Sequence, residues 1–349
     1  MINKIKKYFF ALATDKKNNT FYSFLKVILL AFSYIYYLLV EIVVFLYMND
    51  IFKRFSSDLK VISVGNITLG GTGKTPVEYY LIKHIFNKKK VSLIARGYNN
   101  DELNLMQLNF PNIKILAGKN RIKLVKKASG VFKSDVAIVD DGFQHWRIRR
   151  DIDIVIIDAS NPFGNGHLIP RGILREPVSH LIRADIFVIT KRDLGQGNLT
   201  SLKEILKRTN PGALIVESQY KPLYLYNPQR DKKIDIQEIR NKKVSAFCAI
   251  GSPESFKYTL GKMGVNLGSF SDFIDHYQYK VKDIERIVKE ANENTSEFII
   301  TTEKDWMRLN SELIDVMSKN FKFCILKIDI DIVSGEEKLI ERLLSLFNN

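Results

Sequence analysis

Cysteine is scarce in this sequence: only Cys248 and Cys324 occur in 349 residues. The two lie far apart and lack the short spacing of metal ligands, so neither a disulfide scaffold nor a structural zinc site is expected. A reducing compartment fits this cysteine usage better than an oxidising one. Internal repeats and low-complexity tracts are also missing.

Acidic residues are outnumbered by basic ones. Lys and Arg total 53 against 38 Asp and Glu, which gives a formal net charge of +15. Such a balance favours acidic partners, namely nucleic acid, an anionic membrane surface or phosphorylated ligands. The length fits about two domains, and the contents of 46% hydrophobic and 26% charged residues exclude wholesale disorder.

The N-terminal segment lacks the cleavage site of a secretory signal. Five lysines within residues 1–20 precede an apolar stretch over residues 27–48, whose one acidic residue is Glu41. The stretch is long enough to span a bilayer, but basic residues on both sides oppose a single span under the positive-inside rule. We therefore predict an interfacial helix buried in one leaflet, with a true span or a buried core helix as the alternatives.

The body of the chain predicts an α/β fold. Near-continuous apolar runs recur from residue 61, and helical patterns separate several of them, for example over residues 76–87 and 119–128. Runs without polar alternation are typical of strands buried on both faces. We expect a P-loop NTPase-like, doubly wound, mostly parallel sheet, a second, smaller α/β domain and an N-terminal membrane-associated helix.

Changes in composition predict the domain boundaries. We expect a basic segment and membrane-associated helix over residues 1–50 and a P-loop domain over residues 51–220. A polar, charged linker over residues 221–243 would lead to the smaller domain, residues 244–349, which ends in a closing helix.

The strongest motif is the glycine-rich run GNITLGGTGKT at residues 65–75, between a buried strand and a helix. Backbone N–H groups of such a loop turn inward around phosphate oxygens, and the N-terminus of the next helix faces the same anion. Lys74 is expected to reach the β- and γ-phosphates and Thr75 to bind Mg²⁺. The residues predicted to bind the nucleotide are Thr68 (in place of the usual first glycine), Gly70, Gly71, Thr72, Gly73, Lys74 and Thr75.

A second apolar strand ends in Asp140 and Asp141, which is the Walker B arrangement. One of these carboxylates would hold Mg²⁺ directly or through water. The alternative is a helix N-cap followed by a turn residue. Gln144 and His145 continue from the same loop.

The run Thr190-Lys191-Arg192-Asp193 follows another strand and is similar to the guanine-reading N-K-x-D element of GTPases. Because its first position is Thr and not Asn, we favour an ordinary loop at a strand end over guanine reading.

Several blocks together resemble the tetraacyldisaccharide 4'-kinase family: GNITLGGTGKTP, ARGY, DDGFQHWRIRRDIDIVIIDA, GNGHLIPRGILREP and TTEKD. The resemblance covers nearly the whole chain. It implies transfer of the γ-phosphoryl of ATP to the 4'-hydroxyl of a tetraacylated glucosamine disaccharide 1-phosphate. It also implies a two-stranded linker between a P-loop domain and a smaller α/β domain, and a peripheral or monotopic location at the cytoplasmic face of the bacterial inner membrane.

Site residues follow from the resemblance position by position. Asp101 and His276 match the base machinery of the family, although Asp101 follows Arg-Gly-Tyr at a shorter spacing and without the glycine and proline of the family's G-D-E-P element. The implied catalytic residues are Asp101, His276, Lys74, Asp140 and Asp141. The implied substrate contacts are Tyr98, Arg121, Gln144, His145, Arg175 and Glu176, and the implied metal ligands are Thr75, Asp140 and Glu176.

The expected cofactors are ATP and Mg²⁺, and the expected partners are a phosphorylated glycolipid and the inner-membrane surface. Neither nucleic acid nor an obligate protein partner is expected. Two alternatives stay open: a P-loop GTPase of metallochaperone type, which would usually bring Cys and His metal ligands, and a membrane-anchored nucleic-acid-binding ATPase, whose interleaved basic and aromatic stripe is absent.

Overall fold

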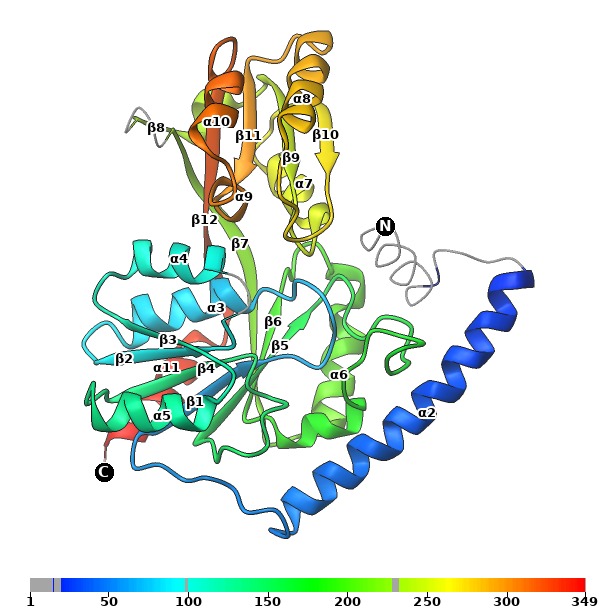
Figure 1. Cartoon of the computed structure of the whole chain (residues 1–349), viewed down its shortest axis with the longest axis vertical. Helices are drawn as coiled ribbons and strands as arrows, with labels where there is room; N and C mark the ends of the chain where they lie inside the picture. The colour runs from blue at the N-terminus through cyan, green and yellow to red at the C-terminus, as the bar shows by residue number, and fades with distance from the viewer. Residues whose placement is uncertain (1–14, 16–19, 98–99, 228–231, 349) are drawn as a thin grey trace. The chain divides into compact units, whose positions relative to one another are not determined.

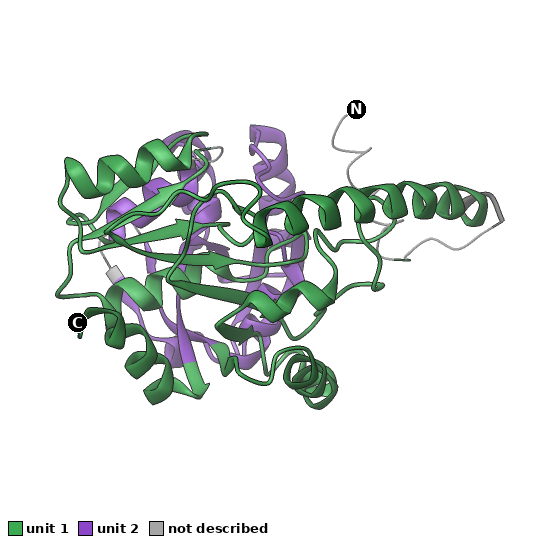
Figure 2. Cartoon of the chain, turned by 90° about the horizontal axis from the view of Figure 1, so that it is seen from below, with its two compact units in different colours: residues 1–98, 110–219, 332–349 green, residues 99–109, 220–331 purple. Residues whose placement is uncertain are grey.

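The computed structural model describes residues 15, 20–97, 100–227 and 232–348 (Figure 1). The chain divides into two compact units (Figure 2). The first comprises residues 1–98, 110–219 and 332–349, and the second comprises residues 99–109 and 220–331. Two strands, β7 (Leu214–Asn227) and β12 (Lys322–Ser334), each run from one unit into the other.

The first unit is built on a parallel sheet in the strand order β7-β6-β5-β1-β4-β2-β3. Its other strands are β1 (Lys60–Gly65), β2 (Val91–Ala95), β3 (Lys114–Ala117), β4 (Val136–Asp140), β5 (Ile152–Asp158) and β6 (Ile186–Thr190). Most strand residues are buried whichever way they point, as the uninterrupted apolar runs predict. The central strand β1 lies between β4 and β5, and ligands bind beyond the carboxyl ends of strands at such a switch in strand order.

Helices flank this sheet. The first unit contains α2 (Thr20–Met48), α3 (Lys74–Tyr80), η1 (Leu81–Ile85), α5 (Arg121–Gly130), η2 (Val178–Arg183), η3 (Gln196–Asn198), α6 (Leu199–Thr209), α11 (Glu336–Leu344) and η5 (Ser345–Phe347). The first residue of a helix can often be predicted from a capping residue before it, and α5 is an example. The side chain of Asn120 accepts a hydrogen bond from the backbone N–H of Lys123 at 3.1 Å and so caps the first turn.

The second unit has a sheet in the order β10-β9-β11-β12-β7, with β8 antiparallel to β7. The strands β10 (Asn266–Asp272), β9 (Lys243–Cys248), β11 (Phe298–Thr302) and β12 are mutually parallel, and β8 is Lys232–Ile234. Its helices are α4 (Asn100–Asn109), η4 (Ile236–Ile239), α7 (Pro253–Lys262), α8 (Val281–Glu293), α9 (Glu303–Trp306) and α10 (Ser311–Ser318). Together the two sheets give the α/β class and the mostly parallel pairing expected from sequence.

The units are less contiguous in sequence than the predicted domains. The helix α4 connects β2 to β3 of the first unit, yet it belongs to the second, where Glu102 pairs with Lys304 and Asn109 accepts a hydrogen bond from Lys327 at 2.7 Å. The helix α11 was expected to close the smaller domain but lies in the first unit. The reason is that β12, which precedes it, runs from the second unit into the first.

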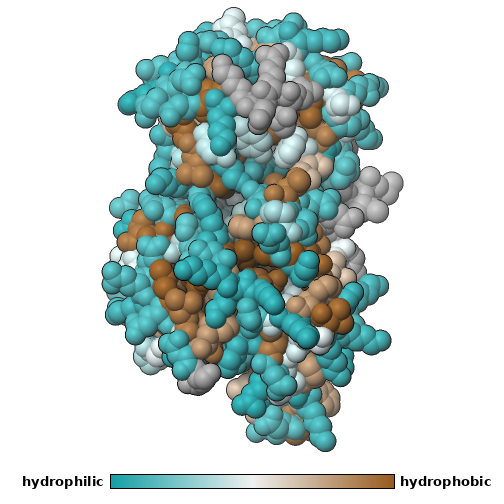
Figure 3. All heavy atoms as spheres, turned by 90° about the vertical axis from the view of Figure 1, so that its left-hand side faces the viewer, coloured by the Kyte–Doolittle hydropathy of each residue, from teal (hydrophilic) through white to brown (hydrophobic). Residues whose placement is uncertain are grey.

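The predicted N-terminal helix is α2, and in the described part of the chain it is the one helix long and apolar enough to cross a membrane. One side of α2 is buried against the first unit through Leu29, Val40 and Val44. The other side leaves large apolar side chains in the open, at 55–70% exposure: Phe24, Val27, Phe32, Ile35, Leu38, Leu39, Ile42, Phe45 and Met48. Figure 3 shows the left-hand side of the view in Figure 1, where apolar residues gather in patches among hydrophilic ones.

Candidate active site

The glycine-rich loop connects β1 to α3. Gly70 and Gly73 have φ angles of 115° and 96°, which side chains rarely allow, so glycine is needed at both turns. Thr68 and Thr72 are buried at the base of the loop. Asn66 fastens the loop, because its Nδ2 donates to the Thr68 carbonyl at 2.8 Å and to Thr72 Oγ1 at 3.0 Å. The sequence analysis assigned no role to Asn66, although its position directly after the strand was a usable signal.

Lys74 opens α3 and faces the acidic end of β4, the strand beside β1 in the sheet. Its Nζ lies 3.4 Å from Asn66 Oδ1 and 3.5 Å from Asp141 Oδ1. The parallel register pairs Val64 of β1 with Asp140 of β4, so the acidic pair lies beside the start of the loop. The predicted meeting of phosphate loop and acidic strand end is therefore present within one unit.

Asp141 is held by three basic side chains. Arg175 Nη1 donates to both carboxylate oxygens at 2.8 Å, and Arg121 Nη1 donates to the Asp141 backbone carbonyl at 2.9 Å. Burial alone would raise the pKa of Asp141, but the charges of Lys74, Arg175 and Arg121 outweigh it and lower the pKa. The carboxylate stays ionised and fixes these cations around the loop.

Gln144 and His145 lie in the same cluster. Gln144 Nε2 donates to the Asn66 carbonyl at 2.9 Å, and its Oε1 lies 3.3 Å from Arg175 Nη1. Burial, followed by the charges of Arg121 and two further arginines, lowers the pKa of His145 to about 4. His145 is therefore neutral near pH 7 and adds no charge of its own.

Glu176 does not fit the substrate and metal roles predicted for it. Its side chain is 0% exposed and pairs with His180 Nδ1 at 2.9 Å and with Arg183. A carboxylate that is completely buried and already paired offers no surface to a ligand, so the structure supports neither the substrate role nor the metal role of Glu176. The resemblance carried it over because it directly follows Arg175, but the two side chains have different partners.

The loop after β6 also contacts the phosphate loop. Thr190 Oγ1 donates to the Thr72 carbonyl at 2.6 Å, and Lys191 Nζ donates to the Gly71 carbonyl at 2.8 Å while pairing with Asp158. Asp193 Oδ1 instead accepts the backbone N–H of Leu194 at 3.1 Å. These contacts favour the predicted strand-end loop over guanine reading. They also show that Thr190 and Lys191 support the phosphate loop.

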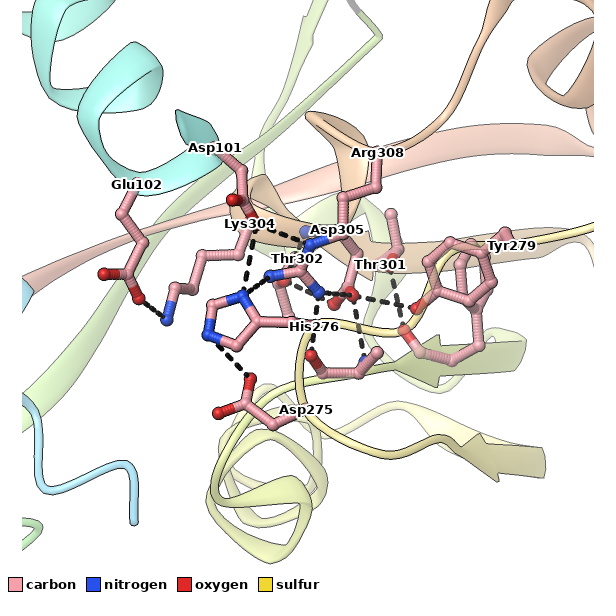
Figure 4. A network of polar contacts seen from close by, with 12 residues as sticks. Asp101, Glu102, Asp275, His276, Tyr279, Thr301, Thr302, Lys304, Asp305 and Arg308 are labelled. Carbon is pink, nitrogen blue, oxygen red and sulfur yellow. Dashed lines mark hydrogen bonds and ion pairs between the residues drawn. The ribbon is translucent and has the colours of Figure 1, made fainter. Parts of the chain in front are cut away.

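A second cluster lies within the second unit (Figure 4). Asp101, in the first turn of α4, places Oδ2 3.4 Å from His276 Nδ1. Arg308 contacts both residues, with Nε 2.6 Å from Asp101 Oδ2 and Nη2 3.1 Å from His276 Nδ1. The predicted pairing of Asp101 with His276 is present. Arg308 was missed.

Asp305 of the TTEKD run lies beside Arg308 in this cluster, toward Tyr279 (Figure 4). Its buried carboxylate accepts hydrogen bonds from the Ala249 N–H at 2.9 Å, from the Tyr279 hydroxyl at 2.8 Å and from the Thr302 hydroxyl at 2.6 Å. Arg308 Nη1 lies 3.4 Å from Asp305 and donates to the Ala249 carbonyl at 2.9 Å. These contacts fix the orientation of the Arg308 guanidinium that binds Asp101.

The protonation states follow from these contacts. Burial would raise the pKa of Asp101, but hydrogen bonds from His276 and Arg308 and the charge of Arg308 outweigh it and hold the pKa well below its usual range. His276 Nδ1 lies within hydrogen-bonding distance of both Asp101 Oδ2 and Arg308 Nη2, so it donates to the carboxylate or accepts from the guanidinium depending on the tautomer. Its Nε2 lies 3.7 Å from Asp275 Oδ1.

The remaining predicted residues are placed as follows. Thr75 is in the first turn of α3, Arg121 is buried at the start of α5, and Asp140 is the last residue of β4. Tyr98 lies outside the described residues. His276 adopts a φ of 61°, uncommon for a non-glycine residue and often associated with functional positions.

Comparisons with known proteins agree on one family. Residues 25–104 and 100–348 match the family described as tetraacyldisaccharide-1-P 4'-kinase. The tetraacyldisaccharide 4'-kinase of Halothermothrix orenii is 35% identical over 85% of this chain and 87% of its own length. That of Syntrophus aciditrophicus is 34% identical over 75% of this chain and 79% of its own length.

A solved structure supports the same family. The LpxK of Aquifex aeolicus, crystallised in complex with ATP, is 25% identical and superposes with a TM-score of 0.71 over 93% of this chain and 99% of its own. The phosphate loop, the acidic strand end and the second unit are therefore parts of one known fold. This chain belongs to the tetraacyldisaccharide 4'-kinase family.

Proposed function

We propose that this chain transfers the γ-phosphoryl group of ATP to the 4'-hydroxyl of a tetraacylated glucosamine disaccharide 1-phosphate in lipid A biosynthesis. Family membership and relatives named for this reaction support the proposal. The observation that carries it is the cluster of Lys74, Asp141 and Arg175 at the phosphate loop. Phosphoryl transfer requires positioning and charge neutralisation more than covalent chemistry, and these residues provide both.

The nucleotide would bind with its phosphates in the loop between Asn66 and Lys74. Two cations, Lys74 and Arg175, flank the loop, and Asp141 keeps them in place. The negative charge that develops on the transferring phosphoryl would be met by groups already oriented, which is how electrostatic catalysis lowers a barrier.

Mg²⁺ fits the oxygen donors at this site. Among the described residues no group of three or more His, Cys, Asp or Glu is placed to hold a metal, but Mg²⁺ bound with phosphates needs only one or two protein ligands. Thr75 and Asp140 supply hard oxygen donors of this kind. Asp141 is less suited because Arg175 occupies both of its carboxylate oxygens. The ion would neutralise the β- and γ-phosphates.

Asp101 and His276 are assigned to proton removal from the sugar hydroxyl. A sugar hydroxyl is a weak nucleophile, so a carboxylate that accepts its proton is chemically sensible. The lowered pKa keeps Asp101 ionised, and His276 lies within 3.4 Å of it to orient it or share the proton. The acceptor is a phosphorylated lipid, which also accounts for a net charge of +15 without nucleic acid.

The enzyme would act at a membrane surface, and we place it at the cytoplasmic face of the inner membrane as a peripheral or monotopic protein. The exposed apolar side of α2 supports this location, since a lipid substrate has to be reached from its bilayer.

The test is a phosphorylation assay of the full chain with ATP and the lipid disaccharide 1-phosphate in mixed micelles. We expect Lys74→Ala to lower turnover roughly 10²-fold or more, as the loss of one transition-state charge contact does elsewhere. Lys88→Ala, which removes an exposed lysine of the same unit, serves as the matched control and should match the wild type.

Two further arms of the assay separate the alternatives. A metallochaperone-type GTPase would prefer GTP and hydrolyse it without the lipid, whereas the proposed kinase needs ATP and the lipid together. Full turnover in EDTA would remove Mg²⁺ from the proposal. Near-normal activity of Lys74→Ala would show that the loop is not the catalytic phosphate site.

A further inference from the structure

The buried side of α2 carries polar groups that bind one short segment of the first unit. Ser33 Oγ donates to the Leu168 carbonyl at 2.8 Å and accepts the Arg171 N–H at 3.0 Å. Tyr36 donates its hydroxyl to the Arg175 carbonyl at 2.9 Å. Ser33 and Tyr36 are three residues apart and so share one helix face, and all three hydrogen bonds are made with residues 168–175.

The same segment also binds the phosphate loop. Leu69 N–H donates to the Ile173 carbonyl at 2.7 Å, and Arg175 N–H donates to the Ile67 carbonyl at 2.7 Å. Thr68 and Leu174 form a β-bridge between these two bonds. Residues 168–175 therefore contact both α2 and the entry of the loop.

Arg175 joins the two sets of contacts. Its carbonyl accepts the Tyr36 hydroxyl, its N–H binds Ile67, and its guanidinium binds both oxygens of Asp141. A displacement of α2 that broke the Tyr36 bond would act on the same residue that orients Asp141.

Glu41 provides a second contact between α2 and the rest of the first unit. Its Oε1 lies 3.0 Å from His180 Nε2, and His180 Nδ1 lies 2.9 Å from the buried Glu176. The one acidic residue in the apolar stretch is thus a partner for a histidine of the P-loop unit. A carboxylate there would be costly in a bilayer interior, and this contact explains its presence.

We propose that α2 helps to shape the nucleotide site: through Ser33 and Tyr36 it positions residues 168–175, and through them the phosphate loop and Asp141, while Glu41 fixes the helix at His180. The proposal rests on the assignment of the loop and Asp141 to ATP made above. It makes Tyr36 a positioning residue, and it gives the helix a role in catalysis that is separate from any contact with lipid.

The experiment compares Tyr36→Phe with Tyr34→Phe in detergent micelles at saturating lipid acceptor. Tyr34 is on the same helix and 64% exposed, so its variant removes an equivalent hydroxyl without the contact. We expect Tyr36→Phe to lower kcat/KM for ATP roughly three- to tenfold, the usual effect of one lost hydrogen bond. Tyr34→Phe should match the wild type. Glu41→Gln, combined with Tyr36→Phe, should deepen the loss.

Three readouts decide between the possible roles of the helix. ATP affinity is measured without lipid, the KM for the lipid acceptor separately, and attachment to anionic vesicles by co-sedimentation. A change in ATP affinity or in kcat with unchanged sedimentation supports the proposal. An effect confined to the lipid KM, or no effect at all in a folded Tyr36→Phe protein, overturns it. Lys74→Ala is assayed alongside, because an active Lys74→Ala protein would instead show that the loop assignment is wrong.

Discussion

Arg308 is the residue that best explains the chemistry of the second cluster. Its side chain is 1% exposed and contacts Asp101, His276 and Asp305 at once. One guanidinium thus keeps Asp101 ionised and holds His276 beside it. A base that must accept a proton from a sugar hydroxyl benefits from this fixed geometry but is weakened by the lowered pKa, since a low pKa makes a poor proton acceptor.

Replacement of Arg308 by Gln should therefore shift the pH dependence of the reaction. Without the positive charge the pKa of Asp101 rises, so the carboxylate becomes protonated at a higher pH as the solution is acidified. We expect the acid limb of the kcat/KM profile to move to higher pH, and kcat near neutral pH to fall roughly tenfold as His276 loses its orientation. The measurement is a full pH–rate profile.

Arg308→Lys is the control, because it keeps the charge but loses the forked donors. It should retain more of the wild-type acid limb than Arg308→Gln does while also losing kcat. If Arg308→Gln is folded, with a normal melting curve, and its acid limb coincides with that of the wild type, Arg308 does not act through Asp101.

At the scale of elements, the loop after β6 is a support for the phosphate loop. Lys191 is 2% exposed, and its ammonium group binds the Gly71 carbonyl and Asp158. We expect Lys191→Met to raise the KM for ATP roughly tenfold, because a charged hydrogen bond to the loop is lost. It should also cost about 1–3 kcal/mol of unfolding free energy, since Asp158, 12% exposed, loses its charge partner while Ser160 still binds its other oxygen.

A double variant separates these two effects. In Lys191→Met/Asp158→Asn no unpaired charge remains, so the melting temperature should recover while the KM for ATP stays high. If both recover together, Lys191 contributes to stability alone and does not position the loop.

Parts of this site were predictable from sequence because their signals are local. The phosphate loop and the acidic strand end each occupy one contiguous run, and parallel strands bring their carboxyl ends together. The roles of Arg308 and Tyr36 were not predictable, since their partners lie 207 and 139 residues away in the chain. The placement of α4 in the second unit was missed for the same reason, because the pairs that hold it there join it to residues beyond position 300.

At the scale of the whole molecule, the contacts of α2 favour an interfacial helix over a membrane span. The candidate span runs from Ser23 to Met48, and the buried residues along it are spread from Leu29 to Val44. A span needs about 20 residues surrounded by lipid, so α2 could cross a bilayer only by leaving the first unit. Lying in one leaflet, it can keep its polar contacts and bury its exposed side in lipid.

Substitution of the exposed apolar side should therefore release the chain from membranes. We expect Phe32→Ser/Leu38→Ser/Phe45→Ser to reduce co-sedimentation with vesicles of anionic lipid severalfold, because each side chain, 56–59% exposed, loses apolar area that would enter the leaflet. The residual binding should fall further with added salt, since the net charge of +15 still attracts an anionic surface. Val131→Ser, at a 68% exposed apolar position remote in sequence from α2, is the matched control and should sediment like the wild type. Sedimentation of the triple variant that equals the wild type in high salt would place the membrane contact on another surface.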